Sequence, residues 1–423
     1  MTSAGGQQDD SREGPNAPSE ADDIAPGARH DPTAPMVDAR TVVSYIGWFL
    51  LFSLALGFLV RARVNLLLLP SGSVMRKYDG FDGYDGVRRK SLYYEAHASE
   101  YDLVFAGDSR TYCGTDPYVI DSALGTSSFV LATFSHWLPT QYPNYQDIVA
   151  KVPRGTTVVW SIGHVNFEHV HDTEHLTYPI GVANIPRYLT WGYSWNRIGE
   201  NALGLLPGLD LFAHRVSFRA KFDAVFDRLL VAPKVREARP APDTRLADTV
   251  IAENTGAPHV INVEPIVRDG AVTSVAVLTD RGNLRRVEVD SAFHRAKQEE
   301  AAAKVIVQGK TFVGAPELWK TFLAILDLFE AHSINLVVNE FQEAPFNYRN
   351  PHNREVFDAF MSTVRKEVER RGIPYVKVDF SQLTDSDYFD YDHLNSSGIP
   401  KYSKMLSELV RPHLKKRASG AVQ

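Results

Sequence analysis

Cysteine is almost absent from this chain of 423 residues, in which Cys113 is the only one. A single cysteine excludes an intrachain disulfide framework and any metal site built from several thiolates, although it does not identify the compartment. A strong charge of one sign is also missing, because 45 basic residues face 51 acidic ones, for a net charge of −6. Such a mild charge gives no reason to expect nucleic acid as a partner.

The two ends of the chain have little apolar content. Residues 1–41 are rich in Ala, Pro, Gly, Asp and Ser and have no apolar periodicity. Such a segment cannot bury enough surface to offset its ordering entropy, so we expect a disordered tail, and residues 416–423 form a second, short tail. The first segment is not a signal peptide, because the apolar run that follows it begins too late.

Residues 42–60 form an apolar run, VVSYIGWFLLFSLALGFLV, without a single charge. As a helix these 19 residues would span roughly 28 Å, which matches a bilayer core of ~30 Å. A buried core helix is the alternative, but it would normally carry some polar positions. The run therefore predicts one N-terminal transmembrane helix, which would make the chain a single-pass membrane protein.

The residues that flank this run bear on its orientation. Arg61 and Arg63 follow it directly, whereas only Arg40 precedes it closely. Taken alone, the positive-inside rule would leave the large C-terminal part in the cytoplasm. Residues 61–100 are predicted as a juxtamembrane linker, in which the three Asp-Gly pairs of residues 79–86 indicate tight turns.

From residue 101 to 415 short apolar runs alternate with amphipathic segments. One predicted helix covers residues 353–371 and another lies near the C-terminus. This alternation predicts an α/β domain with a parallel sheet covered on both faces. The predicted strands are 102–106, 128–133, 156–162, 333–339 and 375–380.

The alternation is interrupted between about residues 168 and 314. Residues 197–231 look helical, 232–256 form a connection rich in proline and charge, and 259–290 alternate like one or two hairpins. We expect a mixed α+β insertion into the α/β domain, with a separately folded small domain as the alternative.

A candidate nucleophile lies where the first predicted strand ends. The apolar run Leu103–Ala106 is followed by Gly107, Asp108 and Ser109. Ligands of open α/β sheets bind at the carboxyl ends of the strands, which is where this hydroxyl would be. A serine needs a base to take its proton and a third group to hold that base.

A candidate base lies in the loop between the last predicted strand and the last helix. Asp390 precedes His393 by three residues, so one turn lets its carboxylate hold the Nδ1 proton while Nε2 faces the serine. Asp392 is adjacent to the histidine and is the alternative acid. The predicted catalytic residues are therefore Ser109, His393 and Asp390.

Gly107-Asp108-Ser109 together with Asp390-x-x-His393 resembles the SGNH (GDSL-like) hydrolase superfamily. The resemblance implies a flavodoxin-like three-layer sandwich in which the serine is the nucleophile. The Gly-Asp-Ser-Arg and Asp-x-x-His-Leu-Asn variants, with one N-terminal span, resemble the membrane-anchored branch that includes alginate O-acetylation and teichoic-acid D-alanyl transfer proteins. The resemblance covers about residues 101–167 and 315–412.

The same family builds its oxyanion hole from a glycine after the second strand and an asparagine after the third. Asn166 follows the third predicted strand and is the expected oxyanion residue, with His164 as a rival for that position. No glycine follows the second strand, where the chain reads Thr133-Phe134-Ser135-His136. A poorly formed hole costs ~10²–10³ in rate, which makes a non-catalytic protein on the same fold a serious alternative.

Two other features bear on ligands. The candidates for binding the substrate are Arg110 and His164. Alternatively, Arg110 could equally pair with Asp108 or Asp102 and only order the loop. The histidines and acids between residues 164 and 175 follow no standard metal-ligand spacing, so we expect no metal and no cofactor.

These features predict a membrane-anchored enzyme of the cell envelope that acts on acyl esters of an extracytoplasmic polysaccharide, as an O-acetyltransferase or an esterase. The resemblance implies a polytopic acyl-donating partner and a large domain outside the cytoplasm, at the inner (plasma) membrane, against the local arginine count. Two alternatives stay open: a non-catalytic glycan-binding or assembly protein, and a cytoplasm-facing lipid or thioester hydrolase.

Overall fold

The fold was analysed in a computed structural model. It describes residues 42–49, 51–52, 84–134, 136–168, 180, 182–195, 198, 245–254, 257–268, 271–289, 294–296, 299, 312–341 and 343–415. The predicted tails, most of the linker and the predicted helical segment 197–231, apart from residue 198, lie outside the described residues.

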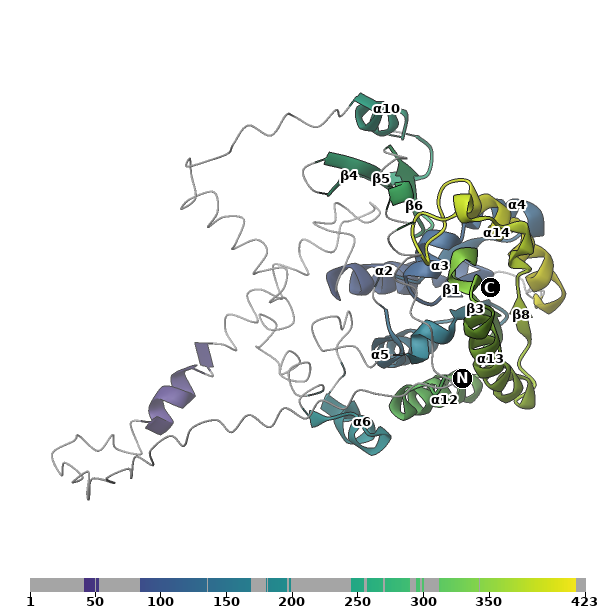
Figure 1. Ribbon diagram of the computed structural model, residues 1–423. Coiled ribbons are helices and arrows are strands. Elements are labelled where there is room, and N and C mark those ends of the chain that lie inside the picture. Colours follow the sequence, from purple (N-terminus) through teal and green to yellow (C-terminus); the bar gives the residue numbers. More distant parts are fainter. Residues whose placement is uncertain are drawn as a thin grey trace, which may run out of the picture. The chain divides into compact units, whose positions relative to one another are not determined.

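The domain that follows is built around a five-stranded parallel sheet with the strand order β2-β1-β3-β7-β8 (Figure 1). The strands are β1 (Leu103–Ala106), β2 (Ser128–Val130), β3 (Thr157–Ile162), β7 (Asn335–Glu340) and β8 (Tyr375–Lys377). Every residue of β1 and β3 is buried, as expected where helices cover both faces of a sheet. The predicted α/β fold with a parallel sheet is confirmed, and each of the five predicted runs overlaps one of these strands.

The helices that connect these strands pack in two groups (Figure 1). They are α3 (Ser109–Gly114), α4 (Pro117–Leu124), α5 (Leu138–Val149), α12 (Pro316–Ala331), α13 (Pro351–Arg370) and α14 (Gly398–Val410). Helix α5 packs against α12, and α4 packs against α14. Right-handed crossovers put these two pairs on opposite faces of the sheet. Short 3₁₀ turns complete the loops: η1 (Ala98–Glu100), η2 (His164–Phe167), η4 (Val182–Asn184), η5 (Pro345–Tyr348), η6 (Phe380–Gln382), η7 (Asp385–Asp387) and η8 (Arg411–His413).

Part of the predicted linker belongs to the folded domain, which corrects the sequence-based boundary. Residues Tyr84–His97 form helix α2, so Asp85-Gly86 lies in a helix and not in a tight turn. The buried Tyr94 stacks on Tyr101 and on Phe129 of β2. The aromatic contacts explain why the helix forms here despite its Asp-Gly start, since tertiary packing overrides weak local propensity.

The insertion contains a second, antiparallel sheet in the order β4-β5-β6. Its strands, β4 (Val260–Arg268), β5 (Ala271–Thr279) and β6 (Leu284–Glu288), lie where the sequence alternation predicted hairpins. Helix α10 (Arg245–Asn254) occupies part of the predicted connection 232–256. It forms there because Ala247 and Val250 lie on one helical face and pack against Val275 and Val277 of β5. Helix α6 (Ile185–Trp191) precedes this region in the chain.

The turn between β5 and β6 lies against the edge strand β2. The backbone N–H of Val130 donates to the carbonyl of Arg281 at 2.9 Å, and the buried Lys90 ammonium donates to the carbonyls of Gly282 and Ala132. Burial lowers the pKa of Lys90 well below its usual value. A lysine bonded to both segments holds the turn of the insertion on the edge of the main sheet.

The predicted transmembrane run is described only in part. Residues 42–49 and 51–52 are helical, and their eight large apolar side chains are between 41% and 72% exposed. Residues 50 and 53–60 lie outside the described part. Within the described residues, no helix is both long enough and apolar enough to cross a membrane.

We expect Gly282→Ala to destabilise the protein more than Gly125→Ala. Both glycines have a left-handed backbone, with φ of 79° and 68°, and an alanine there costs ~1–2 kcal/mol from strain alone. An added Cβ at Gly282 would also lie 2.6 Å from the carbonyl oxygen of Val130, whereas at Gly125 it would meet nothing within 4 Å. Urea unfolding should show at least twice the loss for Gly282→Ala; equal losses would mean that the turn does not dock on β2 in solution.

Candidate active site

Ser109 is positioned by a glycine and a helix cap directly after β1. Gly107 has a φ of 146°, and a side chain there would collide with Thr111. Asp108 is the N-cap of α3, and its carboxylate accepts the backbone N–H of Arg110 at 3.0 Å. Ser109 is the first residue of the helix and is partly exposed, so its hydroxyl lies at the surface of the sheet edge where β1 ends.

A buried network joins this loop to the loop after β3. Arg110, only 2% exposed, forms an ion pair with Asp108, and its Nη2 donates to Asn166 Oδ1 at 2.5 Å. Asn166 Nδ2 donates to Asp108 at 2.8 Å, and its Oδ1 also accepts the backbone N–H of Gly163. Burial alone would raise the pKa of Asp108, but the charge and hydrogen bonds of Arg110 and the bond from Asn166 hold it below the usual value.

This network changes the roles expected for two residues. Asn166 was expected to bind an oxyanion, yet its amide is buried and turned toward Asp108, so this arrangement serves the loop and not a substrate. Arg110 adopts the loop-ordering alternative, paired with Asp108. Its Nη1 has no hydrogen-bond partner among the described residues and packs against Gly163.

The loop between β8 and α14 carries the expected base and acid. His393 Nδ1 lies 2.9 and 3.0 Å from the two carboxylate oxygens of Asp390. The same carboxylate accepts the backbone N–H groups of Asp392 and His393, which holds it under the ring. His393 Nε2 is buried and has no hydrogen-bond partner in the described part of the chain. The ring is therefore held in place through Nδ1, and Nε2 is available to a substrate or to Ser109.

Asp392 also approaches this histidine. Its Oδ1 lies 2.8 Å from His393 Nδ1 but does not have the angle of a hydrogen bond, so Asp390 is the better-oriented partner. Burial alone would lower the pKa of His393, but the charges of Asp390 and Asp392 outweigh it and hold the pKa well above its usual value. The ligand atoms of Asp390, Asp392 and His393 lie within 4.8 Å of one another, which among the described residues is the arrangement that could hold a metal ion.

Helix α3 packs against the loop that carries His393. A Cβ added to Gly114 would lie 3.5 Å from Leu394 Cδ1, and Phe134 makes T-shaped contacts with both Tyr112 and His393. Burial raises the pKa of the Cys113 thiol, and the charges of His393 and Asp390 also act on it. Ser109 lies one helical turn before Cys113 and shares its face, so the serine and His393 lie at the same sheet edge. No hydrogen bond joins them within the described residues.

A histidine occupies the region after β2 where the resemblance implied a glycine. His136 is fully buried, and its Nδ1 lies 3.2 Å from the carbonyl of Gly107 while Asn144 donates to its Nε2. Burial lowers its pKa to about 4, so the ring is neutral and donates from Nδ1 to the loop of Ser109. This support was not predicted from the sequence, although a histidine shortly after a predicted strand was a signal for it.

His164 lies in the core and does not face a substrate as expected. Its ring stacks on Phe357 with 3.7 Å between centroids, and Nε2 lies 3.6 Å from Glu343. Burial, with the charge of Arg110, lowers the pKa of His164 to about 3, while burial and the charge of Asp392 raise that of Glu343 to about 8. Both groups are neutral near pH 7, so their contact is not an ion pair.

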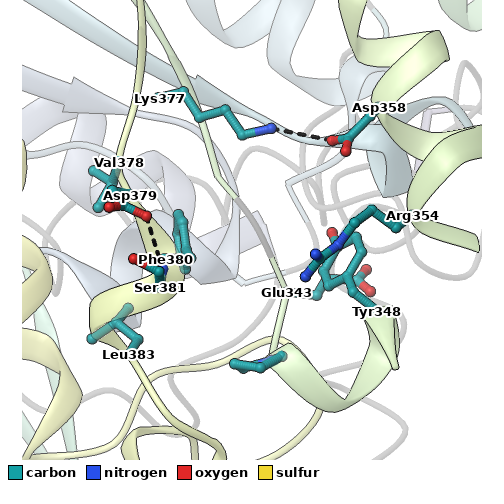
Figure 2. A pocket seen from close by; sticks show the side chains of 11 residues that line it. Glu343, Tyr348, Arg354, Asp358, Lys377, Val378, Asp379, Phe380, Ser381 and Leu383 are labelled. Carbon is teal, nitrogen blue, oxygen red and sulfur yellow. Dashed lines mark hydrogen bonds and ion pairs between the residues drawn. The ribbon is translucent and has the colours of Figure 1, made fainter. Parts of the chain in front are cut away.

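A cavity of about 650 Å³ opens at the carboxyl ends of β7 and β8 (Figure 2). Figure 2 shows Glu343 and Tyr348 on one side of the cavity and Val378 and Asp379 on the other. Lys377 reaches across between the two sides, and its Nζ lies 3.2 Å from Asp358 Oδ1. Ser109 and His393 do not line it. Glu343 lines this cavity, and the charges of Asp392 and Arg110 both act on its pKa.

We expect Asp390→Asn to lower the pKa of His393 more than Asp392→Asn does. Both substitutions remove a negative charge beside the imidazolium, but only the first removes the oriented hydrogen bonds to Nδ1. An NMR titration of the ring measures the two shifts, with Asp385→Asn, paired to Arg349, as a control that leaves the titration unchanged. A larger shift in Asp392→Asn would make Asp392 the orienting acid.

Comparison with known proteins supplies no family. No protein-family model matches the chain, and no curated protein matches it. The likeness to SGNH hydrolases therefore rests on the two motifs and on their placement at one sheet edge.

Proposed function

We propose that this chain is a serine acyl-ester enzyme of the SGNH type. In this proposal Ser109 is the nucleophile, His393 the general base and Asp390 the group that orients the base. The substrate is an acyl, most simply acetyl, ester of an extracytoplasmic polysaccharide, and the reaction is transfer to a sugar hydroxyl or hydrolysis.

The state of His393 carries the proposal. Its Nδ1 is held by the Asp390 carboxylate, while its Nε2 is buried and has no hydrogen-bond partner among the described residues. A buried, unpaired ring nitrogen is unfavourable unless it has a further task. Taking the proton of a nearby hydroxyl is such a task, and the oriented carboxylate stabilises the imidazolium that results.

The chemistry follows from these positions. The Ser109 Oγ–H proton passes to His393 Nε2 as Oγ bonds to the ester carbonyl carbon, and the carbonyl electron pair moves to oxygen. Collapse of this intermediate breaks the bond to the leaving oxygen, which takes the proton from His393. A sugar hydroxyl or water then gives its proton to His393 and attacks the acyl carbonyl carbon. Collapse of this second intermediate breaks the bond to Oγ, which takes the proton back from His393 and restores Ser109.

The fold supports the placement of this chemistry. The strand order β2-β1-β3-β7-β8 is that of flavodoxin-like sheets, in which the order reverses between β1 and β3. Ligands bind where such a reversal opens a crevice at the carboxyl ends of the strands, and Gly107-Asp108-Ser109 follows β1. A flavodoxin-like three-layer sandwich of the SGNH type is therefore the finer fold that we propose.

The membrane setting is part of the proposal. The apolar side chains of residues 42–49 and 51–52 are exposed, which is unfavourable in water and suits a lipid environment. The resemblance to the membrane-anchored branch favours acyl transfer, a polytopic acyl-donating partner and a domain outside the cytoplasm. Arg61 and Arg63 favour the opposite side, but so few residues count for less than the external substrate.

The geometry around Asn166 favours a second candidate function. Its amide forms hydrogen bonds with Asp108 and Arg110. After β2, where the oxyanion-hole glycine was expected, the chain has His136, which contacts the carbonyl of Gly107. A protein that kept the fold but lost its oxyanion donors would bind or assemble glycans without turning them over.

Ser109→Ala is expected to abolish labelling of the full-length chain by a fluorophosphonate probe. It should also lower kcat/KM for a chromogenic acetyl ester by at least ~10³, because the substitution removes the nucleophilic hydroxyl. Ser396→Ala, an exposed serine of the histidine loop, and Cys113→Ala are the controls and should both be labelled. A folded wild-type chain that is not labelled but binds glycan would establish the non-catalytic alternative.

Turnover by the wild-type chain should increase toward alkaline pH. The base acts as neutral imidazole, and the raised pKa of His393 keeps the imidazolium populated to higher pH than usual. The pH profile of kcat/KM measures this limb, which should move to lower pH in Asp392→Asn. A limb that stays at the same pH in that variant would show that another group limits the reaction.

A further inference from the structure

Strand β6 of the insertion presents two arginines to opposite sides. Arg286 pairs with Ala276 of β5 and Arg285 with Val277, and neighbouring residues of a strand point to opposite faces. Arg285 forms an ion pair with Asp116 at 3.0 Å. Arg286 has no ion-pair partner among the residues that the structure describes, and it lies on the opposite face of the strand.

The Arg286 guanidinium lies between two aromatic rings. Its central carbon is 4.8 Å from the ring centre of Phe134 and 5.0 Å from that of Phe389. Such cation–π contacts fix the plane of a guanidinium while leaving its N–H edge available. The Nε of Arg286 is buried and has no hydrogen-bond partner among the described residues.

Both rings belong to the candidate active site. Phe389 directly precedes Asp390, and Phe134 makes a T-shaped contact with the ring of His393, with 6.3 Å between centroids. Burial alone would raise the pKa of Asp390, but the charges of His393 and then Arg286 hold it below the usual value. The charge of Arg286 also acts on Cys113, one turn after Ser109. Arg286 therefore reaches both the histidine loop and the helix of the nucleophile.

Phe134 lies in the region where the expected oxyanion-hole glycine is missing. It follows β2, where an oxyanion-hole glycine would stand, and the amide of Asn166 is engaged with Asp108. Ser109 attack on an ester creates a negative charge for which the main sheet offers little beyond the backbone N–H at the start of α3. The guanidinium stacked on Phe134 is a cationic donor beside that position.

We propose that Arg286, carried in by the insertion, is the oxyanion-stabilising residue of this active site. An N–H of its guanidinium donates to the carbonyl oxygen as the electron pair moves onto it. Arg286 gives up no proton, and the hydrogen bond is released when the carbonyl re-forms. This assignment presupposes the proposed function and adds to it the task of the insertion.

The test measures kcat and KM of Arg286→Gln and Arg286→Lys with two chromogenic acetyl esters, one uncharged and one bearing a carboxylate. Loss of an oxyanion donor should lower kcat ~10²–10³-fold for both esters with KM nearly unchanged, and Arg286→Lys should fall less. Arg285→Gln, on the opposite face of the same strand, is the matched control and should keep its kcat. Added guanidinium chloride at millimolar concentration, but not sodium chloride, should restore part of the activity of Arg286→Gln.

Four outcomes overturn the assignment while leaving Ser109 as nucleophile. The first is an unchanged kcat in Arg286→Gln, and the second is the absence of rescue by guanidinium. The third is an effect confined to a raised KM for the anionic ester, and the fourth is an equal loss of kcat in Arg285→Gln. The third outcome would mean that Arg286 binds a negatively charged group of the substrate. The fourth would mean that the arginines of β6 only stabilise the docking of the insertion. If Arg286→Gln does not fold, Arg286→Lys, which keeps a cation between the rings, carries the same comparison. Absence of fluorophosphonate labelling in the wild type, by contrast, removes the proposed function itself.

Discussion

The buried ion pair between Asp108 and Arg110 is the constraint on which the arrangement of the sheet edge depends. Two charges removed from water need hydrogen-bond partners for their remaining polar atoms, and here Asn166 bonds to both side chains, while Arg110 Nη1 has no partner among the described residues. That requirement ties the loop after β1 to the loop after β3. It also demands a glycine at position 163, because a side chain there would press on the Arg110 guanidinium and on the carbonyl of Phe341. Ser109 is thus held on a rigid base between the two residues of the pair.

Electrostatics divide this edge into a charged part and a neutral part. Around His393, two carboxylates compete for one imidazole nitrogen, and their charge favours the protonated ring. A few side chains away, burial keeps His164 and Glu343 uncharged. Of the two residues, Glu343 lines the cavity in Figure 2, and its neutral state leaves one fewer charge buried near Arg110. In the proposed reaction, this division would confine proton movement to the side of the edge where Asp390 holds the ring.

The sheet was predictable from the sequence because its strands are buried on both faces and therefore read as unbroken apolar runs, as Leu103–Ala106 does. The approach of Asp390 to His393 was predictable because one turn of chain sets it. The directions of side chains were not predictable. The position of Asn166 follows from the end of β3, but the hydrogen bond from its amide to Asp108 depends on a buried carboxylate that follows a different strand. Helix α2 was missed because long-range aromatic packing, and not local propensity, holds it. Arg286 was missed because only the register of β6 and the docking of the insertion bring it to the sheet edge.

The contact between the β5–β6 turn and β2 has a consequence for biosynthesis. Strand β2 is an edge of the main sheet, and Arg281 occupies a backbone position on that edge. An uncovered edge strand is a template for pairing with other chains. During synthesis β2 emerges long before residues 281–282, so the nascent sheet has an open side until the insertion has been made and has docked. Protection of the edge from aggregation and delivery of Arg286 to the sheet then occur in one folding event, and a chain shortened within the insertion would lose both.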